Sequence, residues 1–457
     1  MHDLRQKVLL QSGKTVSRKQ RSHAESSRTS HAGSDNEDEY DDVMTRSTMS
    51  DDGEDEHTAS GKHVAAWPDR LRDRIDALLD SKRSSVQGRA GTLKAYTHLL
   101  KHHYAAQVIS PHAAALISAI SNSISGKSDE EKINALRALS VTILTCPANE
   151  FPQLRAPYEK VCRTLEDRCR DTDGELVKVE VIRALGTYAL YGGGSSDEAS
   201  QFFLGIVQTD GDTVDALDSG AVVSAAMEAW AFVASYTSDL HELADEALEA
   251  FTDQLEAGDP DVQASAAFNI ALLFEAVRRD DEETEAEKPS FQHEHHVAME
   301  KLEQIEGDSS RSVSRKERKD LRSTIRSVMT SLELHKGPGY STAIRQAANP
   351  NKGSGGIKGG EKHSDRQFHE YGSREKVRIG DQLVTIESWA VKARVDMLKT
   401  LLEGGFGEHF MKNPLLEEIL EDAKVEGVAN AASRKSKRGG DEEGFSKKPP
   451  KYLAETY

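Results

Sequence analysis

The sequence predicts an all-α protein: an armadillo/HEAT-like α-solenoid with a small C-terminal helical module and disordered tails. The main observation is a repeat, because stretches that open with a small polar or acidic residue and continue as an apolar helix recur about every 44 residues. They start at Ser85, Asp129, Asp173, Asp218 and Asp261. A period of 40–47 residues is typical of HEAT and armadillo repeats. A non-repetitive helical bundle is the alternative, and the regular spacing argues against it.

Each stretch also has the residue pattern of a helix. Its first residue can accept the free amide hydrogens of the first turn. Apolar residues follow at spacings of 3 and 4, as in Ile133, Leu136 and Leu139, so that each helix buries one stripe. The preceding segment supplies a second helix, as where Ser110–Pro111 opens one with proline in its first turn. We therefore expect antiparallel helix pairs over residues 63–333, with the five helices side by side on one face.

Composition separates four further segments from this domain. Residues 1–62 and 427–457 are expected to be disordered tails, charged and basic respectively, because they have few apolar residues and carry runs of charge. Residues 334–374 are glycine-rich and predict a flexible linker. Residues 375–426 predict a small C-terminal domain.

That C-terminal domain contains two kinds of pattern. Alternation over residues 383–387 predicts one extended segment. Helices are then expected from Trp389, ending at Gly404–Gly405, and from Asn413–Pro414. Because about fifty residues supply little core, we expect this module to pack on the last helices of the solenoid.

No motif for catalysis, a cofactor or a metal is present. The three cysteines, Cys146, Cys162 and Cys169, lack zinc-ligand spacing and are interpreted as buried thiols of a reducing compartment. The sequence HEHH at 293–296 lacks the second histidine of an HExxH site, since Val297 stands there. Phosphate-binding loops and nucleophile elbows are absent from the sequence, and no apolar run is long enough for a bilayer or a signal peptide. We expect a non-enzyme with no cofactor, no small-molecule substrate and no membrane partner.

Charge is unevenly distributed along this chain of net charge −18. Residues 184–277 contain no Lys or Arg but 17 Asp and Glu. Such a surface attracts basic protein and repels phosphate. The alternative is a solvated face that keeps the protein soluble.

A basic stripe follows it. Six cations advance in steps of three and four along one side of a predicted helix: Arg311, Arg315, Arg318, Lys319, Arg322 and Arg326. Val313, Leu321, Ile325, Val328 and Leu332 occupy the opposite side. The stripe is a candidate for binding RNA phosphates. A solvated face, or one paired with the acidic neighbour, is the alternative, and no interleaved aromatic residues indicate base stacking.

A second basic run lies near the C-terminus. The sequence RKSKR is a candidate nuclear-import signal through Arg434, Lys435, Lys437 and Arg438, or part of a nucleic-acid-binding tail.

Three segments together resemble the interferon-related developmental regulator family: DPDVQASAAFNIALLFEAVRR, RSVSRKERKDLRSTIRSVM and VRIGDQLVTIESWAVKARVDMLKTLLEGGFGEHFMKNPLLEEIL. The resemblance covers about residues 65–333 as a helical-repeat domain and 375–426 as a C-terminal domain. It implies a non-enzymatic regulator of gene expression. Members have been linked to translationally inactive ribosomes and to nuclear co-repressor complexes.

Two functional hypotheses result. The first is a cytoplasmic, ribosome-associated translational regulator with ribosomal RNA and ribosomal proteins as partners. The second is a nuclear transcriptional co-regulator that binds basic nuclear proteins through its acidic face. The charge distribution suits the ribosome somewhat better, because it offers RNA phosphate beside basic protein tails.

Overall fold

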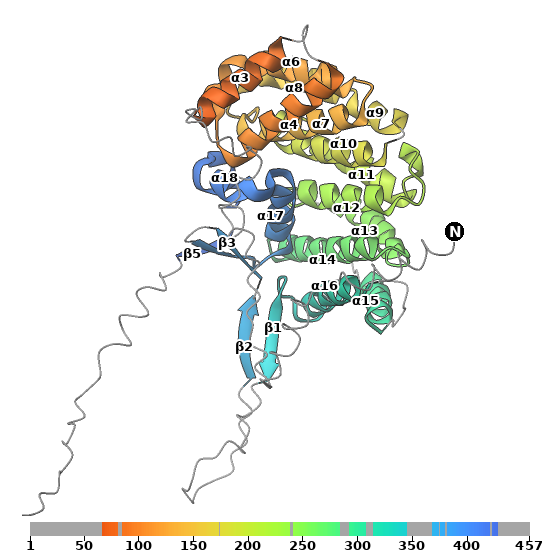
Figure 1. Ribbon diagram of the computed structural model, residues 1–457. Coiled ribbons are helices and arrows are strands. Elements are labelled where there is room, and N and C mark those ends of the chain that lie inside the picture. The colour runs from red at the N-terminus through yellow and green to blue at the C-terminus, as the bar shows by residue number, and fades with distance from the viewer. Residues whose placement is uncertain are drawn as a thin grey trace, which may run out of the picture. The chain divides into compact units, whose positions relative to one another are not determined.

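The computed structural model describes residues 66–80, 85–172, 174–237, 241–283, 292–307, 314–344, 368–373, 375–379, 382–420 and 423–427. All of them belong to one compact unit, Tyr40–Tyr457. The repeat domain has two layers of helices (Figure 1). The inner layer consists of α4 (Val86–His102), α7 (Asp129–Thr145), α10 (Glu175–Thr187), α12 (Gly220–Ala234), α14 (Pro260–Glu283) and α16 (Arg315–Leu334).

The outer layer supplies one helix for each inner helix except α10, for which it supplies two short ones. It consists of α3 (Trp67–Leu79), α6 (Ala113–Ile124), α8 (Arg155–Cys162), α9 (Leu165–Asp171), α11 (Ser196–Gln208), α13 (His241–Gln254) and α15 (Gln292–Gly307). The short helix α5 (Ala106–Ile109) and the 3-10 turn η1 (Ser110–His112) lead into α6, η2 (Pro152–Leu154) leads into α8, and η4 (Asp212–Val214) precedes α12. A π-helical turn, η3 (Tyr188–Gly192), continues α10. Each inner helix contacts the next inner helix in the chain.

Polar contacts show that the inner helices are parallel and in register. The Tyr96 and Thr142 hydroxyls are hydrogen-bonded and lie 46 residues apart in the chain. Arg137 donates to Glu180, which lies 43 residues away, and Asn269 donates to the carbonyl of Met227, which lies 42 residues away. Along one pair, α10 and α12, Ser219 donates to Glu175 at the start, 44 residues away, and Tyr191 bonds to Tyr236 at the end, 45 residues away. Antiparallel neighbours would show separations that change steadily along the helices. The nearly constant separation therefore confirms the repeat architecture that the sequence predicts.

Buried apolar residues of every pair join into one continuous core. Trp230, Phe251 and Tyr158 are among its largest fully buried side chains. The three cysteines are buried too, and burial raises the pKa of the Cys146 thiol to about 12. These thiols therefore stay protonated.

The predicted helix starts require correction at several repeats. Ser85 does cap α4, since its hydroxyl accepts from the Gly88 amide. The cap of α12 is Ser219 and not Asp218, which lies in the preceding loop with a φ of +59°. Asp129 and Asp261 fall inside the first turn of their helices, where a carboxylate is favoured by the helix dipole without acting as the cap. Asp173 lies outside the described residues.

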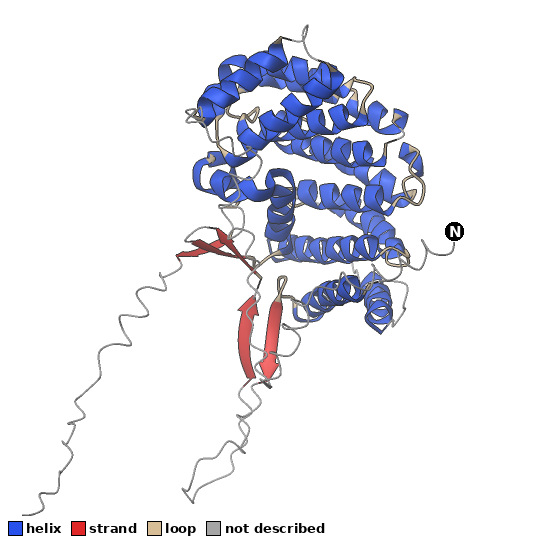
Figure 2. Cartoon of the chain, viewed as in Figure 1, coloured by secondary structure: helices blue, strands red, loops and turns tan. Residues whose placement is uncertain are grey.

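The C-terminal part contains strands that the sequence prediction missed (Figure 2). Strands β3 (Lys376–Ile379), β4 (Gln382–Thr385) and β5 (Lys424–Gly427) form an antiparallel sheet in the order β3-β4-β5, where one extended segment was expected. Strands β1 (Tyr340–Ile344) and β2 (Phe368–Ser373) pair antiparallel at the two ends of the segment predicted as a linker. The prediction of a wholly flexible 334–374 is therefore wrong at both ends, and residues 345–367 lie outside the described residues.

Three helices complete the module: α17 (Trp389–Leu402), α18 (Phe406–Lys412) and α19 (Pro414–Ile419), with the 3-10 turn η5 (Glu403–Gly405) after α17. In Figure 1, α17 lies across the inner helices. It contacts α7, α12 and α14, and α18 contacts α4. The module was expected on the last helices, and it contacts α14 there, but it also reaches the first repeats.

Candidate interaction surfaces

Helix α16 carries most of the predicted basic stripe. It begins after Ser314, whose hydroxyl accepts from the Glu317 amide while the Glu317 carboxylate accepts from the Ser314 amide. This capping box fixes the helix start. Arg311 and Val313 precede it and lie outside the described residues. Ile325, Val328 and Leu332 are buried and Leu321 is half-buried, as the apolar pattern predicts.

The cations of α16 differ in their surroundings. Arg315 and Lys319 are exposed, and within the described ranges neither has an ion-pair partner. Arg326 is exposed, but its Nε donates to Glu306 of α15 at 2.6 Å. Arg318 and Arg322 are half-buried and take part in contacts within the chain. The structure thus leaves Arg315 and Lys319 as the most accessible members of the predicted stripe.

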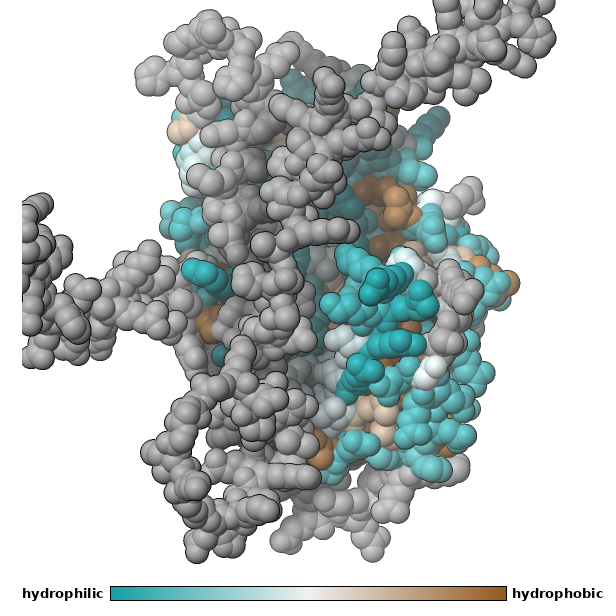
Figure 3. Space-filling view, turned by 60° about the horizontal axis from the view of Figure 1, so that its bottom comes forward, coloured by the Kyte–Doolittle hydropathy of each residue, from teal (hydrophilic) through white to brown (hydrophobic). Residues whose placement is uncertain are grey.

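The predicted acidic surface is strongest on α13. Its exposed carboxylates are Asp245, Glu246, Glu249 and Asp253, and the exposed Glu256 follows in the turn after the helix. Lys301 of α15 lies 2.9 Å from Glu256 and 3.7 Å from Asp253, so the far end of this face is partly neutralised. Figure 3 shows the molecule with the lower end of the stack in Figure 1 turned toward the viewer. The described residues on this face are mainly hydrophilic, and the hydrophobic residues form small separate patches.

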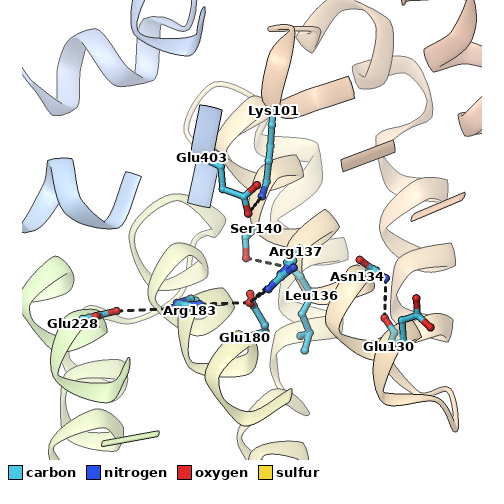
Figure 4. Close-up of polar contacts among 10 residues, drawn as sticks. All are labelled: Lys101, Glu130, Asn134, Leu136, Arg137, Ser140, Glu180, Arg183, Glu228 and Glu403. Carbon is cyan, nitrogen blue, oxygen red and sulfur yellow. Dashed lines mark hydrogen bonds and ion pairs between the residues drawn. The ribbon is translucent and has the colours of Figure 1, made fainter. Parts of the chain in front are cut away.

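A ladder of ion pairs runs along the inner helices (Figure 4). Glu180 is buried and accepts from Arg137, at 2.8 Å for the closest pair of atoms, and from Arg183, at 3.4 Å. Arg183 also approaches Glu228, at 3.7 Å. Lys101 reaches the C-terminal module, where it binds Glu403 at 2.8 Å. Sequence reasoning missed this ladder, although opposite charges one repeat apart were a visible signal.

The C-terminal module caps the carboxyl ends of three inner helices. His409 hydrogen-bonds to the Leu100 carbonyl of α4 at 2.7 Å. Asn413 donates to the Leu144 carbonyl of α7 at 2.9 Å, and Arg394 donates to the Ser235 carbonyl, at the end of α12, at 2.5 Å. The last carbonyls of a helix have no partner inside the helix. Each of these side chains therefore satisfies a group that burial would otherwise leave unpaired.

Two further features hold the module in place. The Arg394 guanidinium lies 4.0 Å from the centroid of the Tyr236 ring. At the amino end of α17, Glu275 of α14 accepts from the backbone amides of Trp389, at 2.8 Å, and Ala390, at 3.3 Å. A carboxylate at a helix amino terminus is favoured by the dipole. The indole of Trp389 also donates to Ser331 of α16 at 3.1 Å. The module is thereby joined to the repeats by specific buried bonds.

The remaining predictions concern metal binding, membrane spans and nuclear import. Within the ranges given above, no cluster of three or more His, Cys, Asp or Glu residues could hold a metal ion. Among the helices that the structure describes, none is long and apolar enough to cross a membrane. The import candidates Arg434, Lys435, Lys437 and Arg438 lie outside the described residues.

Fold and surfaces together define a helical-repeat protein whose C-terminal module is docked across its inner layer. The family model described as "Interferon-related developmental regulator (IFRD)" matches residues 36–333, and the chain belongs to this family. The resemblance of residues 375–426 to the family's C-terminal domain stays a prediction.

Two individual proteins are similar to this chain. An uncharacterised protein of Schizosaccharomyces pombe is 24% identical over 373 residues, which are 79% of this chain and 75% of that protein. The crystal structure of an engineered protein is 15% identical with a TM-score of 0.37, covering 57% of this chain and 97% of its own.

Proposed function

We propose that this protein is a non-enzymatic scaffold that associates with the ribosome and regulates translation, with α16 contacting ribosomal RNA. The observation that supports this most directly is the pair Arg315 and Lys319, exposed one turn apart on the last helix of the stack. Guanidinium and ammonium groups in this arrangement bind phosphates and release counterions. Family membership supports a regulatory role of this kind.

The test is co-sedimentation with ribosomes on a sucrose gradient, with and without ribonuclease. We expect Arg315→Glu combined with Lys319→Glu to remove most of the ribosome-bound fraction. Loss of two phosphate contacts should also reduce the slope of log affinity against log salt by about 2. Both side chains are exposed, so the fold should be retained and helix propensity hardly changes.

A matched control carries the same charge change at the other end of the stack. Arg74→Glu on α3 and Lys94→Glu on α4 alter two exposed cations. This control should still co-sediment. The proposal fails if the α16 variant sediments with ribosomes as the wild-type protein does, and an equal loss in the control would indicate only a general charge effect.

The second candidate is a nuclear co-regulator that binds basic proteins through the α13 carboxylates. It is favoured by the absence of Lys and Arg from residues 184–277. Glu249→Lys combined with Glu246→Lys should then reduce binding to basic nuclear proteins. The ribosome-bound fraction should not change in that variant, which separates the two functions.

A further inference from the structure

A groove lies where the inner helices meet the C-terminal module. Helices α12, α14 and α17 line it, α16 contributes Thr324, and its volume is about 260 Å³. Its apolar lining comes from Ala231, Ala264, Phe268, Ala393 and Met397. Inner surfaces of helical repeats are extended binding surfaces. The groove is therefore positioned where a partner segment would be bound.

Asn269 gives this groove an unused acceptor. The side chain is 1% exposed and lines the groove. Its Nδ2 donates to the Ser265 carbonyl at 2.8 Å and to the Met227 carbonyl at 3.2 Å, which fixes the orientation of the amide, since carbonyls require a donor. Within the described part of the chain, Oδ1 has no hydrogen-bond partner. A buried acceptor without a partner is costly and calls for a donor from elsewhere.

The charges around the groove are predominantly negative. Glu228 and Asp396 both line it. Glu228 is 46% exposed and its pairing with Arg183 is loose, at 3.7 Å. Lys392 is the cation of the lining, and it is bound by Glu375 of the neighbouring sheet and by Asp396 at 3.1 Å. Burial lowers the pKa of Lys392, but these two carboxylates outweigh burial and raise it, so its charge is already compensated.

The sequence explains why the groove-lining parts of α12 and α14 bring no Lys or Arg of their own. Residues 184–277 contain no Lys or Arg, so α12 and the groove-lining part of α14 supply carboxylate and amide acceptors without a matching donor. A ligand that fits must therefore have an apolar chain that packs against Ala231, Phe268 and Met397. At the end of this chain it must carry a group with several hydrogen-bond donors.

We propose that this groove binds an arginine side chain presented by a partner protein. The three-carbon stem of arginine suits the apolar walls, and its guanidinium has five N–H donors in a planar fork. These donors match the acceptors of Glu228 and Asn269, both of which line the groove, better than the point charge of lysine does. The groove does not include Arg315 or Lys319 of α16. The proposal of an arginine site is therefore independent of the proposal of ribosome binding.

The test uses the full chain and a fluorescein-labelled, N-acetylated heptapeptide of alanine and serine with one central arginine. Its partner probe carries citrulline, which has the same shape without the charge. Fluorescence anisotropy should show the arginine peptide binding at least about tenfold more tightly than the citrulline peptide, as expected for charge-assisted hydrogen bonds.

Two variants of the groove act by different routes. Glu228→Gln removes the charge and should weaken the arginine peptide about tenfold. Ala264→Trp fills the groove without changing charge and should abolish binding. Glu130→Gln on α7, another inner helix, is the matched control for an exposed carboxylate and should bind as wild type does. Circular dichroism melting checks that each variant is folded.

Three results would overturn the proposal. Equal affinity for the arginine and citrulline peptides would show that no guanidinium site exists. Unchanged binding in both groove variants would place the peptide elsewhere. The third result concerns the protein's own tail, tested by a full-chain variant in which Gln replaces Arg434, Lys435, Lys437 and Arg438. If this variant binds the arginine peptide more tightly than wild type does, the tail, and not a partner, is the occupant of the groove.

Discussion

At the scale of single residues, His409 shows how a buried titratable group joins the module to the first repeats. Its ring is fully buried. Nε2 is bonded to the Leu100 carbonyl and must donate, while Nδ1 lies 3.3 Å from the Asn413 Nδ2 and accepts. The neutral ring with its proton on Nε2 therefore satisfies both nitrogens. A second proton on Nδ1 would face the Asn413 donor in a buried site.

This arrangement predicts a dependence of stability on pH. Burial lowers the pKa of His409 below its usual 6.5, despite the opposing effect of the bond to Leu100. The unfolded chain then binds a proton more readily than the folded one, so this contribution is complete above about pH 6.5 and is lost as the pH falls below it. We expect His409→Gln, whose amide can still donate to Leu100, to lose less stability between pH 7 and 5 than wild type does.

Urea unfolding at a series of pH values measures this difference, and comparison of the two proteins cancels the other histidines. Parallel pH profiles for wild type and variant would contradict the assignment of a buried neutral His409.

At the scale of elements, the C-terminal module fits the inner helices closely enough to exclude a methyl group. A Cβ added at Gly405, in the turn η5, would lie 1.8 Å from the Lys101 carbonyl oxygen at the end of α4. The Lys101 oxygen is a backbone atom and the position of a Cβ is fixed by the Gly405 backbone, so a side chain there forces the two elements apart. The glycine is therefore required by packing rather than by its own backbone angles.

We expect Gly405→Ala to reduce the free energy of unfolding by about 1–3 kcal/mol, the usual cost of overpacking, and to make the module cleavable by protease. Gly205→Ala on α11 is the matched control, because nothing lies within 4 Å of the added Cβ. That change should stabilise by about 0.5–1 kcal/mol through helix propensity. Equal stability of the two variants would show that η5 does not pack against the end of α4.

Much of the element level could be predicted from the sequence, because an apolar stripe with helical spacing is a local pattern. The repeat period, the starts of α17 and α19, and the buried side of α16 follow from it. The pairing of Tyr340 with Ser373 and the bond from His409 to Leu100 could not be predicted, since each joins residues far apart in the chain. The spacing of the cations likewise placed Arg318 and Lys319 on one face of the helix. It could not show that Arg318 is half-buried by contacts within the chain while Lys319 is exposed.

At the scale of the whole molecule, the module changes what kind of repeat protein this is. In a simple solenoid each repeat contacts its neighbours, so the ends fray and stability is nearly a sum over repeats. Here one module bonds to α4, α7, α12 and α14, which are not all neighbours. We therefore expect the first and last repeats to be stabilised together.

Hydrogen exchange followed by mass spectrometry tests this coupling. Arg394→Met, His409→Ala and Asn413→Ala together remove the three bonds to helix ends, and each lost bond leaves a buried carbonyl unpaired at a cost of about 1–3 kcal/mol. Amides of α4 should then exchange at least about tenfold faster although no residue of α4 has changed, because 1.4 kcal/mol corresponds to a factor of ten. Lys412→Ala with Glu417→Ala, two exposed positions of the same module, is the control and should leave α4 protected. If α4 keeps wild-type protection in the triple variant while the module itself exchanges rapidly, the repeats are stable by themselves and the module is only attached to them.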